Sequence, residues 1–229
     1  MKKTICALLL SALVLSQFGC GSSKESAIVF PPTRVGSSLI LSSSPVKVYT
    51  FDDAMEEAEA VARITVGSWL GETVDGSNHS YYEATVLQCF KGDLPEKFTL
   101  IQIGSSARTR KNYPLFTAGN ELLVFLMKAS PYPAAPKIAD LTSPYYIVGS
   151  YMTFMDVAYD SDGHRYYADR YGYLGGSIPP RTILNYNNHI SIGPQIRDDL
   201  AKKDPLAYES CSYPYIFAED DLIPLLTRD

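Results

Sequence analysis

Residues 119–127 read Gly-Asn-Glu-Leu-Leu-Val-Phe-Leu-Met, and this stretch decides the expected fold. From Leu122 to Met127 every side chain is apolar, so a strand here buries both of its faces. A strand of this kind belongs at the centre of a sheet. The sequence therefore predicts a central strand that follows a turn at Gly119 and Asn120.

Other segments of the chain carry strand patterns, and turn signals such as Asp75-Gly76 and Asp162-Gly163 separate them. Connected antiparallel strands in this number commonly close into a barrel, which removes exposed edges. The sequence therefore predicts a mainly β fold, an OB-like closed antiparallel barrel. The expected strands are residues 61–70, 81–90, 97–103, 122–127, 145–149, 152–159 and 164–168.

Short helices are expected at the periphery of this barrel. Thr50 and Asp53 resemble a capping box, and apolar residues recur at helical spacing from Phe51 to Ala62. A second helix is predicted to begin near Pro194. Residues 217–226 predict a last short turn of helix at the C-terminus.

Two short sequence words resemble those of a known group of domains. Phe90-Lys91-Gly92 ends one expected strand, and residues 116–125, with the pattern Phe-x-x-Gly-x-x-Leu-Leu-Val-Phe, lead into another. Residues 57–127 are similar to netrin-like modules, to the tissue inhibitors of metalloproteinases, and to bacterial exported proteins of unknown role. The resemblance implies an OB-type barrel. The resemblance does not extend to protease inhibition. Those inhibitors bind the zinc of their target through a free N-terminal cysteine amine, whereas the expected N-terminal cysteine of this chain, Cys20, would carry lipid and precede a flexible tether.

The N-terminus has the pattern of an export signal. Lys2 and Lys3 precede residues 5–15, which are apolar except for Ser11. This run is shorter than the roughly 20 residues that a membrane-spanning helix needs, but it suits a signal peptide. Gly19-Cys20 then resembles the lipobox of bacterial lipoproteins, although Gln17 stands where that family has Leu, Val or Ile. The resemblance implies cleavage before Cys20 and acylation of its thiol; the alternative is a plain signal peptide cut near Gly19.

The sequence divides into three parts on this interpretation. Residues 1–19 are the signal peptide, residues 20–45 are the lipidated cysteine and a tether, and residues 46–229 are a single domain. The tether holds eight serines between residues 21 and 45, a composition typical of loose structure. Either of its apolar runs, residues 28–30 and 39–41, could dock on the domain as an edge strand. The acyl chains would anchor the protein in the cell membrane or outer membrane, facing outside the cytoplasm.

The charge of the chain limits its partners. The formal net charge is −5, and removal of residues 1–19, which hold two lysines and no acidic residue, makes it −7. Binding to nucleic acid needs a basic face on the protein, and electrostatic binding to anionic lipid needs one as well. The expected contact with a membrane is therefore through the lipid, and no nucleic-acid partner is expected.

Cys89 and Cys211 are the cysteines outside the leader and the anchor. Export makes a disulfide between them possible, and a bond across so long a loop would stabilise the fold. The alternative is two unpaired, partly buried thiols.

The sequence contains no recognised catalytic, metal or cofactor motif. His79, His164 and His189 do not lie at ligand spacing, so a structural or solvent-exposed role is expected for each. Nucleophile-elbow, Walker A and dinucleotide-binding patterns are missing. Residues 160–163 fit a hairpin turn better than a calcium loop. The basic residues Arg108, Arg110 and Lys111 are interpreted as a solvated loop, with an anion contact as the alternative.

Tyrosine is unusually frequent, with 17 in the chain. Tyr166, Tyr167, Tyr171 and Tyr173 cluster, and their amphipathic rings suit a binding face for a protein or glycan, although strands favour tyrosine for packing as well. The sequence favours a non-enzymatic binding module. One alternative is an envelope hydrolase assembled from distant residues, such as His164 or His189 with a nearby Asp. The other is a protease inhibitor, by fold analogy alone.

Overall fold

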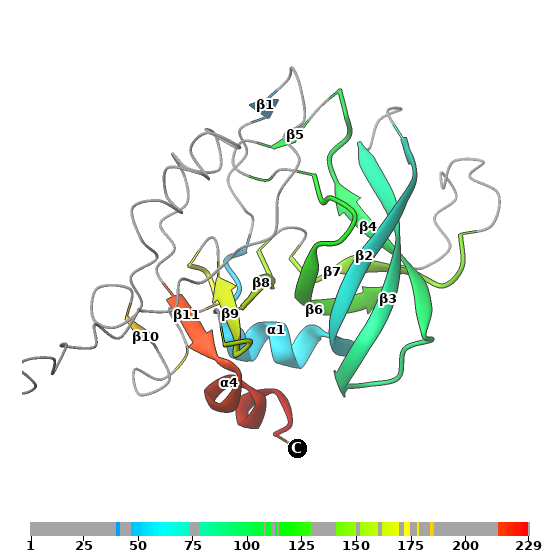
Figure 1. Ribbon diagram of the computed structural model, residues 1–229. Helices are drawn as coiled ribbons and strands as arrows, with labels where there is room; N and C mark the ends of the chain where they lie inside the picture. The colour runs from blue at the N-terminus through cyan, green and yellow to red at the C-terminus, as the bar shows by residue number, and fades with distance from the viewer. Residues whose placement is uncertain are drawn as a thin grey trace, which may run out of the picture.

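The computed structural model describes residues 40–41, 47–73, 78–107, 109–110, 113, 115–129, 141–149, 152–159, 162–169, 172–174, 178, 184–185 and 215–228 (Figure 1). The signal peptide, Cys20 and the helix expected near Pro194 lie outside these residues. The described elements are β1 (Ile40–Leu41), α1 (Phe51–Glu57), β2 (Ala60–Thr73), β3 (His79–Lys91), β4 (Lys97–Ile103), β5 (Thr109–Arg110), β6 (Glu121–Lys128), β7 (Pro144–Ile147), β8 (Phe154–Tyr159), β9 (Arg165–Asp169), β10 (Leu184–Asn185), β11 (Tyr215–Ala218) and α4 (Glu219–Leu226).

Five strands form a closed barrel, as the sequence predicted. Their order is β6-β2-β3-β4-β7, and β7 pairs back to β6 to close the ring. If the five strands are numbered along the chain, the order around the barrel is 1-2-3-5-4. The β4–β7 pairing is parallel, and the other four are antiparallel. The barrel is OB-like, a small Greek-key barrel filled by its own side chains.

The barrel core is apolar and rich in aromatic rings. Tyr82 and Tyr113 each pack edge-on against Phe116, which in turn meets Phe154 at 5.4 Å between ring centroids. These rings lie together inside the barrel core. The buried members of the barrel core are Ala60, Ala62, Ile64, Val66, Tyr82, Ala84, Phe98, Leu100, Tyr113, Phe116, Leu122, Val124, Leu126, Tyr145, Ile147 and Phe154.

The central strand predicted from residues 122–127 is β6, and it is buried on both faces. Leu122, Val124 and Leu126 face the barrel core. Leu123 and Phe125 face a second apolar cluster, the outer core, on the outside of the barrel. The buried members of the outer core are Phe51, Ala54, Ala58, Val61, Leu123, Phe125, Val148, Met155, Val157, Tyr167, Leu174, Ile178, Phe217, Leu222 and Leu226.

One edge of β6 is shared between two neighbouring strands. Its first half, residues 122–124, pairs with β8, and its second half, residues 126–128, pairs with β7. The sheet therefore leaves the barrel at β6 and continues as the flanking sheet β8-β9-β11-β10. The hairpin expected at Asp162-Gly163 joins β8 to β9, and Gly163 has the positive φ of 85° that this turn uses.

Helices α1 and α4 cover the outer core. Figure 1 shows them side by side below the flanking strands, at the end of the barrel away from β1 and β5. The predicted capping box is present, because Thr50 Oγ1 accepts from the Asp53 amide while the Asp53 carboxylate accepts from Thr50. The helix ends at Glu57, however, and Ala62 belongs to β2. Residues 60–65 pair with β6, and this pairing overrides the helical spacing.

The C-terminal helix turn predicted for residues 217–226 is confirmed as α4, with Pro224 inside it. Its first turn carries three acidic residues, Glu219, Asp220 and Asp221, which suit the positive end of the helix dipole. Phe217, just before the helix, is fully buried in the outer core. The last strand and helix of the chain therefore complete the apolar cluster that begins with Phe51.

The two sequence words that resemble netrin-like modules, Phe90-Lys91-Gly92 and residues 116–125, each form specific local contacts. Gly92 has φ 75°, and a Cβ at this position would lie 2.1 Å from the carbonyl oxygen of Glu59. The Lys91 ammonium donates to the carbonyl of Met55, near the C-terminal end of α1. The second word forms a turn, in which the Gly119 amide donates to the Val66 carbonyl at 2.8 Å. Both words therefore fix how neighbouring segments meet β2.

Most strand predictions lie close to the observed bounds, and β4 agrees with its prediction. β2 and β3 are longer than expected, because they pair with each other from Val61 and Lys91 to Thr73 and His79. The loop expected over residues 104–112 contains the short strand β5. This strand pairs in parallel with β1, so the second apolar run of the tether does dock on the domain. The first run, residues 28–30, lies outside the described residues.

Candidate functional site

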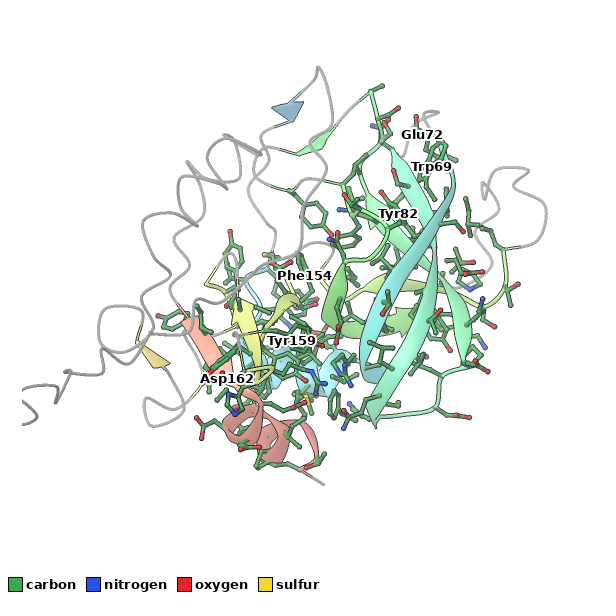
Figure 2. The ribbon with its side chains drawn as sticks, in the orientation of Figure 1. Trp69, Glu72, Tyr82, Phe154, Tyr159 and Asp162 are labelled. Carbon is green, nitrogen blue, oxygen red and sulfur yellow. The ribbon has the colours of Figure 1, made fainter. Side chains whose placement is uncertain are left out.

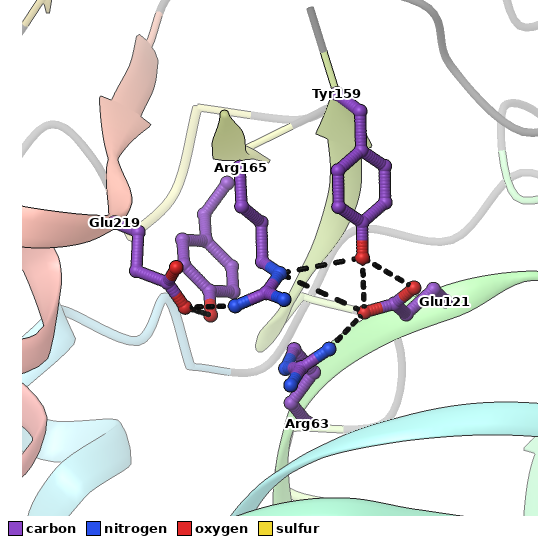
Figure 3. A network of polar contacts seen from close by, with 6 residues as sticks. Arg63, Glu121, Tyr159, Arg165 and Glu219 are labelled. Atoms are coloured by element: carbon purple, nitrogen blue, oxygen red, sulfur yellow. Dashed lines mark hydrogen bonds and ion pairs between the residues drawn. The ribbon is translucent and has the colours of Figure 1, made fainter. Parts of the chain in front are cut away.

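A cluster of charged and tyrosine side chains joins the barrel to the flanking sheet (Figure 3). The Glu121 network consists of Arg63 on β2, Glu121 on β6, Tyr159 on β8, Arg165 and Tyr167 on β9, and Glu219 at the start of α4. All of these strand positions lie on the outer face of the sheet, at the border of the outer core. The network therefore draws its members from five elements that are far apart in sequence.

Glu121 lies at the centre of the Glu121 network. Its carboxylate forms an ion pair with Arg63 and accepts from the Tyr159 hydroxyl at 2.7 and 2.8 Å. The Arg165 Nε lies 3.3 Å from the same hydroxyl and 4.0 Å from Glu121 Oε1. The side chains of Arg63 and Glu121 are 12% and 18% exposed, so water screens this pair only in part.

The other half of the network centres on Glu219. Its carboxylate pairs with Arg165 and accepts from the Tyr167 hydroxyl at 3.2 Å. Burial raises the pKa of Tyr167, and the nearby Glu219 charge raises it further. Burial tends to lower the pKa of Arg165, but hydrogen bonds with Tyr159 and Glu219 outweigh it and the pKa is raised. Arg165 therefore stays charged and Tyr167 stays neutral at physiological pH.

The charges of this network balance. Two arginines face two carboxylates, and each carboxylate has both an arginine and a tyrosine hydroxyl as partners. These contacts link β2 and β6 of the barrel to β8, β9 and α4, and they hold the flanking sheet and α4 against the barrel.

A second distinctive feature lies at the far end of the β2–β3 hairpin, which we call the β2 tip, residues 67–73. Trp69 and Leu70 are 49% and 41% exposed there. Among the described residues, β6 accompanies β2 only from Ala60 to Thr65, so the β2 tip has a neighbour on the β3 side alone. Figure 2 shows Trp69 at this end, while Tyr82, opposite it in the register, lies in the barrel core.

Glu72 ties the β2 tip to the segment that follows β4. Its carboxylate accepts from the Ser106 amide at 2.7 Å and from the Ser106 hydroxyl at 2.6 Å. Ser106 comes three residues before β5. The contact therefore brings the exposed β2 tip close to β5 and to its partner β1.

The structure contradicts one member of the predicted tyrosine face. Tyr167 is fully buried in the outer core, so it cannot contribute to a binding face. Tyr166 is half-buried and follows the opposite face of β9, because neighbouring residues of a strand alternate. Tyr173 is also half-buried, and Tyr171 lies outside the described residues. The packing alternative explains the buried tyrosines, including Tyr82, Tyr113 and Tyr145.

The cysteine predictions fall partly outside the described residues. Cys89 is exposed, and its thiol donates to the carbonyls of Lys91 at 3.2 Å and Gly92 at 3.5 Å. Partial burial raises the pKa of this thiol. Cys211 lies outside the described part, so a bond between the two stays a prediction, as does acylation of Cys20. No helix within the described ranges is long and apolar enough to cross a membrane.

The histidines do not form a site with one another in the described part. His79 is buried at the start of β3 and packs edge-on against Tyr146, with 5.7 Å between ring centroids. His164 is exposed beside the β8–β9 turn, and His189 lies outside the described residues. The side chains of Arg108, Arg110 and Lys111 are likewise not described. Among the residues that are described, no group of three or more His, Cys, Asp or Glu could hold a metal ion.

No protein-family model matches this chain, and no curated protein matches it either. The functional interpretation therefore depends on the chain itself. Sequence reasoning did not find the Glu121 network, because Arg63 and Glu121 are 58 residues apart and no local spacing links them. It also passed over Trp69, although this residue is the one tryptophan of the chain and lies at the end of the expected strand 61–70.

Proposed function

We propose that this protein is a lipid-anchored lipoprotein of the bacterial envelope, and that its OB-like barrel is a non-enzymatic module that binds a protein or glycan. The observation that carries the proposal is the filled barrel core. Tyr82, Phe116 and Phe154 pack against one another where a small ligand would otherwise enter. Contact with a ligand therefore takes place on the outside of the barrel.

The outer surface of β3 and β4 is the best candidate for this contact. OB barrels bind oligonucleotides and oligosaccharides on their second and third strands, which are β3 and β4 here. Thr85 and Lys97 pair across these strands and face away from the barrel core, to which their neighbours Ala84 and Phe98 belong. Lys97 also pairs with Glu83 at 3.3 Å, and both side chains are well exposed. Small polar and oppositely charged groups of this kind suit a polar ligand.

The anchor is tested on the native protein. Mass spectrometry of the N-terminal peptide is expected to find Cys20 as the first residue, carrying acyl chains. A Cys20→Ala variant is expected to leave the membrane fraction, because two acyl chains are what give stable attachment. An unmodified Cys20 in the native protein would contradict the anchoring half of the proposal.

The binding face is tested by photo-crosslinking in living cells. A photoreactive amino acid at Thr85 is expected to give a discrete adduct of higher mass, and the same amino acid at Asp162 serves as the control. Asp162 is exposed on the β8–β9 turn, away from β3 and β4 (Figure 2). Equal adducts at both positions, or none at Thr85, would show that the β3–β4 surface is not the binding face.

A further inference from the structure

The β2 tip carries two of the exposed large apolar side chains of the described structure. Trp69 and Leu70 follow one another and are both about half exposed, although neighbouring strand residues normally include one buried side chain. The register with β3 shifts between Val66 and Trp69, and beyond Thr65 the strand no longer pairs with β6. Tryptophan has the amphipathic character of side chains that settle at a membrane–water interface, and the neighbouring leucine adds apolar surface.

The path of the chain places this tip on the side from which the tether comes. Glu72 binds Ser106, and Ser106 lies three residues before β5, at most about 11 Å away along the chain. β5 pairs with Ile40 and Leu41 in β1. Figure 1 shows β1, β5 and the ends of β2 and β3 at the same end of the molecule, opposite α1 and α4.

The length of chain before β1 sets the average distance expected between the domain and an acylated Cys20. Ile40 follows Cys20 by 20 residues, and a serine-rich chain of that length spans about 25 Å on average. β2 alone has 14 residues and is about 45 Å long at its usual rise. The anchor therefore favours an orientation in which the β1–β5 end faces the bilayer and α1 and α4 face away from it.

We infer that the β2 tip is a membrane-contact site, in which Trp69 and Leu70 enter the interfacial region of the bilayer that holds the lipid anchor. This inference rests on the proposed lipidation of Cys20. The contact orients the domain, because two attachments, the acyl chains and the β2 tip, fix which face of the barrel points outward. The net charge of the chain is negative, so the contact depends on apolar insertion and needs no anionic lipid.

Trp69 is the one tryptophan of the chain, so its fluorescence reports directly on the contact. The native acylated protein is reconstituted into vesicles of phosphatidylcholine and, separately, of phosphatidylcholine brominated along its acyl chains. Bromine quenches an indole that lies close to it. Trp69 emission is expected to be roughly twofold lower in the brominated vesicles, because interfacial side chains sit about 5–10 Å deep at the headgroup–acyl boundary.

A matched variant moves the reporter to another exposed position. The double substitution Trp69→Phe and Leu87→Trp places the one indole on β3, at a site 43% exposed in the wild type and nearer the opposite end of the barrel. Its emission is expected to be the same in both kinds of vesicle. Equal quenching of the two indoles, or of neither, would overturn the inference.

The outcomes separate this inference from the proposed function. If Cys20 is acylated but Trp69 is not quenched by bromine, the lipoprotein proposal stands and the membrane contact is wrong. If Trp69 is instead shielded from acrylamide in native membranes without bromine quenching, the β2 tip contacts a protein. If mass spectrometry finds Cys20 unmodified, the anchor itself fails.

Discussion

Gly92 shows most directly how one residue position determines the backbone path. It lies where β3 ends, with φ 75°, and its missing side chain leaves room for the backbone of Glu59 and Ala60. We expect Gly92→Ala to lower the free energy of unfolding by about 3 kcal/mol, because a Cβ adds a backbone clash to the cost of the left-handed conformation. Urea denaturation measures this change.

Gly119 is the matched control for Gly92. It also has a positive φ, 90°, but a Cβ there would meet no atom within 4 Å. Gly119→Ala should therefore cost only about 1–2 kcal/mol, the price of the conformation alone. If Gly92→Ala and Gly119→Ala lower the free energy of unfolding equally, the clash of a Cβ at position 92 with the Glu59 backbone adds nothing to the cost.

Glu121 is the residue on which the charged network depends. Glu121→Gln leaves Arg63 without its ion pair in a largely buried position. We expect a loss of about 1–2 kcal/mol in the free energy of unfolding, which is less than for a fully buried pair because some solvent remains. Thermal and urea denaturation of the purified domain measure it.

Glu83→Gln is the comparison for Glu121→Gln. Glu83 pairs with Lys97 at 3.3 Å, but both side chains are exposed, so this change should cost less than about 0.5 kcal/mol. If Glu121→Gln and Glu83→Gln lower the free energy of unfolding by the same amount, the Glu121 network has no special stabilising role.

At the scale of elements, the cap of α1 gives a pH-dependent prediction. Hydrogen bonds from Thr50 hold the pKa of Asp53 below its usual value. Because the pKa of Asp53 is lower in the folded protein than in the unfolded chain, where it is near 4, the ionised carboxylate stabilises the fold at pH values above about 4. This stabilisation is lost as the pH falls through the pKa of the folded state. We therefore expect Asp53→Asn to melt below the wild type at pH 7, with a difference that narrows toward pH 3.

The control for this cap lies on the same helix. Glu56 is exposed in α1 outside the Thr50–Asp53 pair, so Glu56→Gln should leave the melting temperature close to that of the wild type across the same pH range. If the wild type and Asp53→Asn melt at the same temperature at pH 7, the capping box does not stabilise the fold.

The elements also show what the sequence could and could not predict. Apolar runs and turn signals are local, so β4, β6 and the β8–β9 hairpin were predicted nearly at their observed bounds. The end of α1 was wrong, because pairing with β6 is a long-range effect that helical spacing does not contain. Tyr167 was a wrong member of the predicted tyrosine face for a related reason, since only the packed fold places it in the outer core.

The candidate sites were harder to predict than the fold. The Glu121 network joins residues from β2, β6, β8, β9 and α4, and each of them looks like an ordinary surface residue in its own segment. Trp69 follows the bulge after Val66. This bulge changes the alternation of inward- and outward-facing side chains along β2, and the sequence pattern does not show the change. Both features depend on tertiary packing, which is absent from local patterns.

At the scale of the whole molecule, the two apolar cores are joined through one strand. Leu122 and Val124 of β6 lie in the barrel core, and Leu123 and Phe125 lie in the outer core. A strand cannot lose one face and keep the other in place, because both faces share one backbone. The barrel and the flanking sheet should therefore unfold as one cooperative unit.

Phe217 tests this cooperativity from the far end of the chain. It is fully buried in the outer core and does not belong to the barrel core. Phe217→Ala should lower the free energy of unfolding by about 3–5 kcal/mol, because it leaves a cavity between β11 and its neighbours. Trp69 fluorescence, which reports on the opposite end of the barrel, should shift to the same urea midpoint as far-ultraviolet circular dichroism. If Trp69 instead keeps the wild-type midpoint while the dichroism shifts, the barrel is stable without its flanking sheet, and β6 does not couple the two cores.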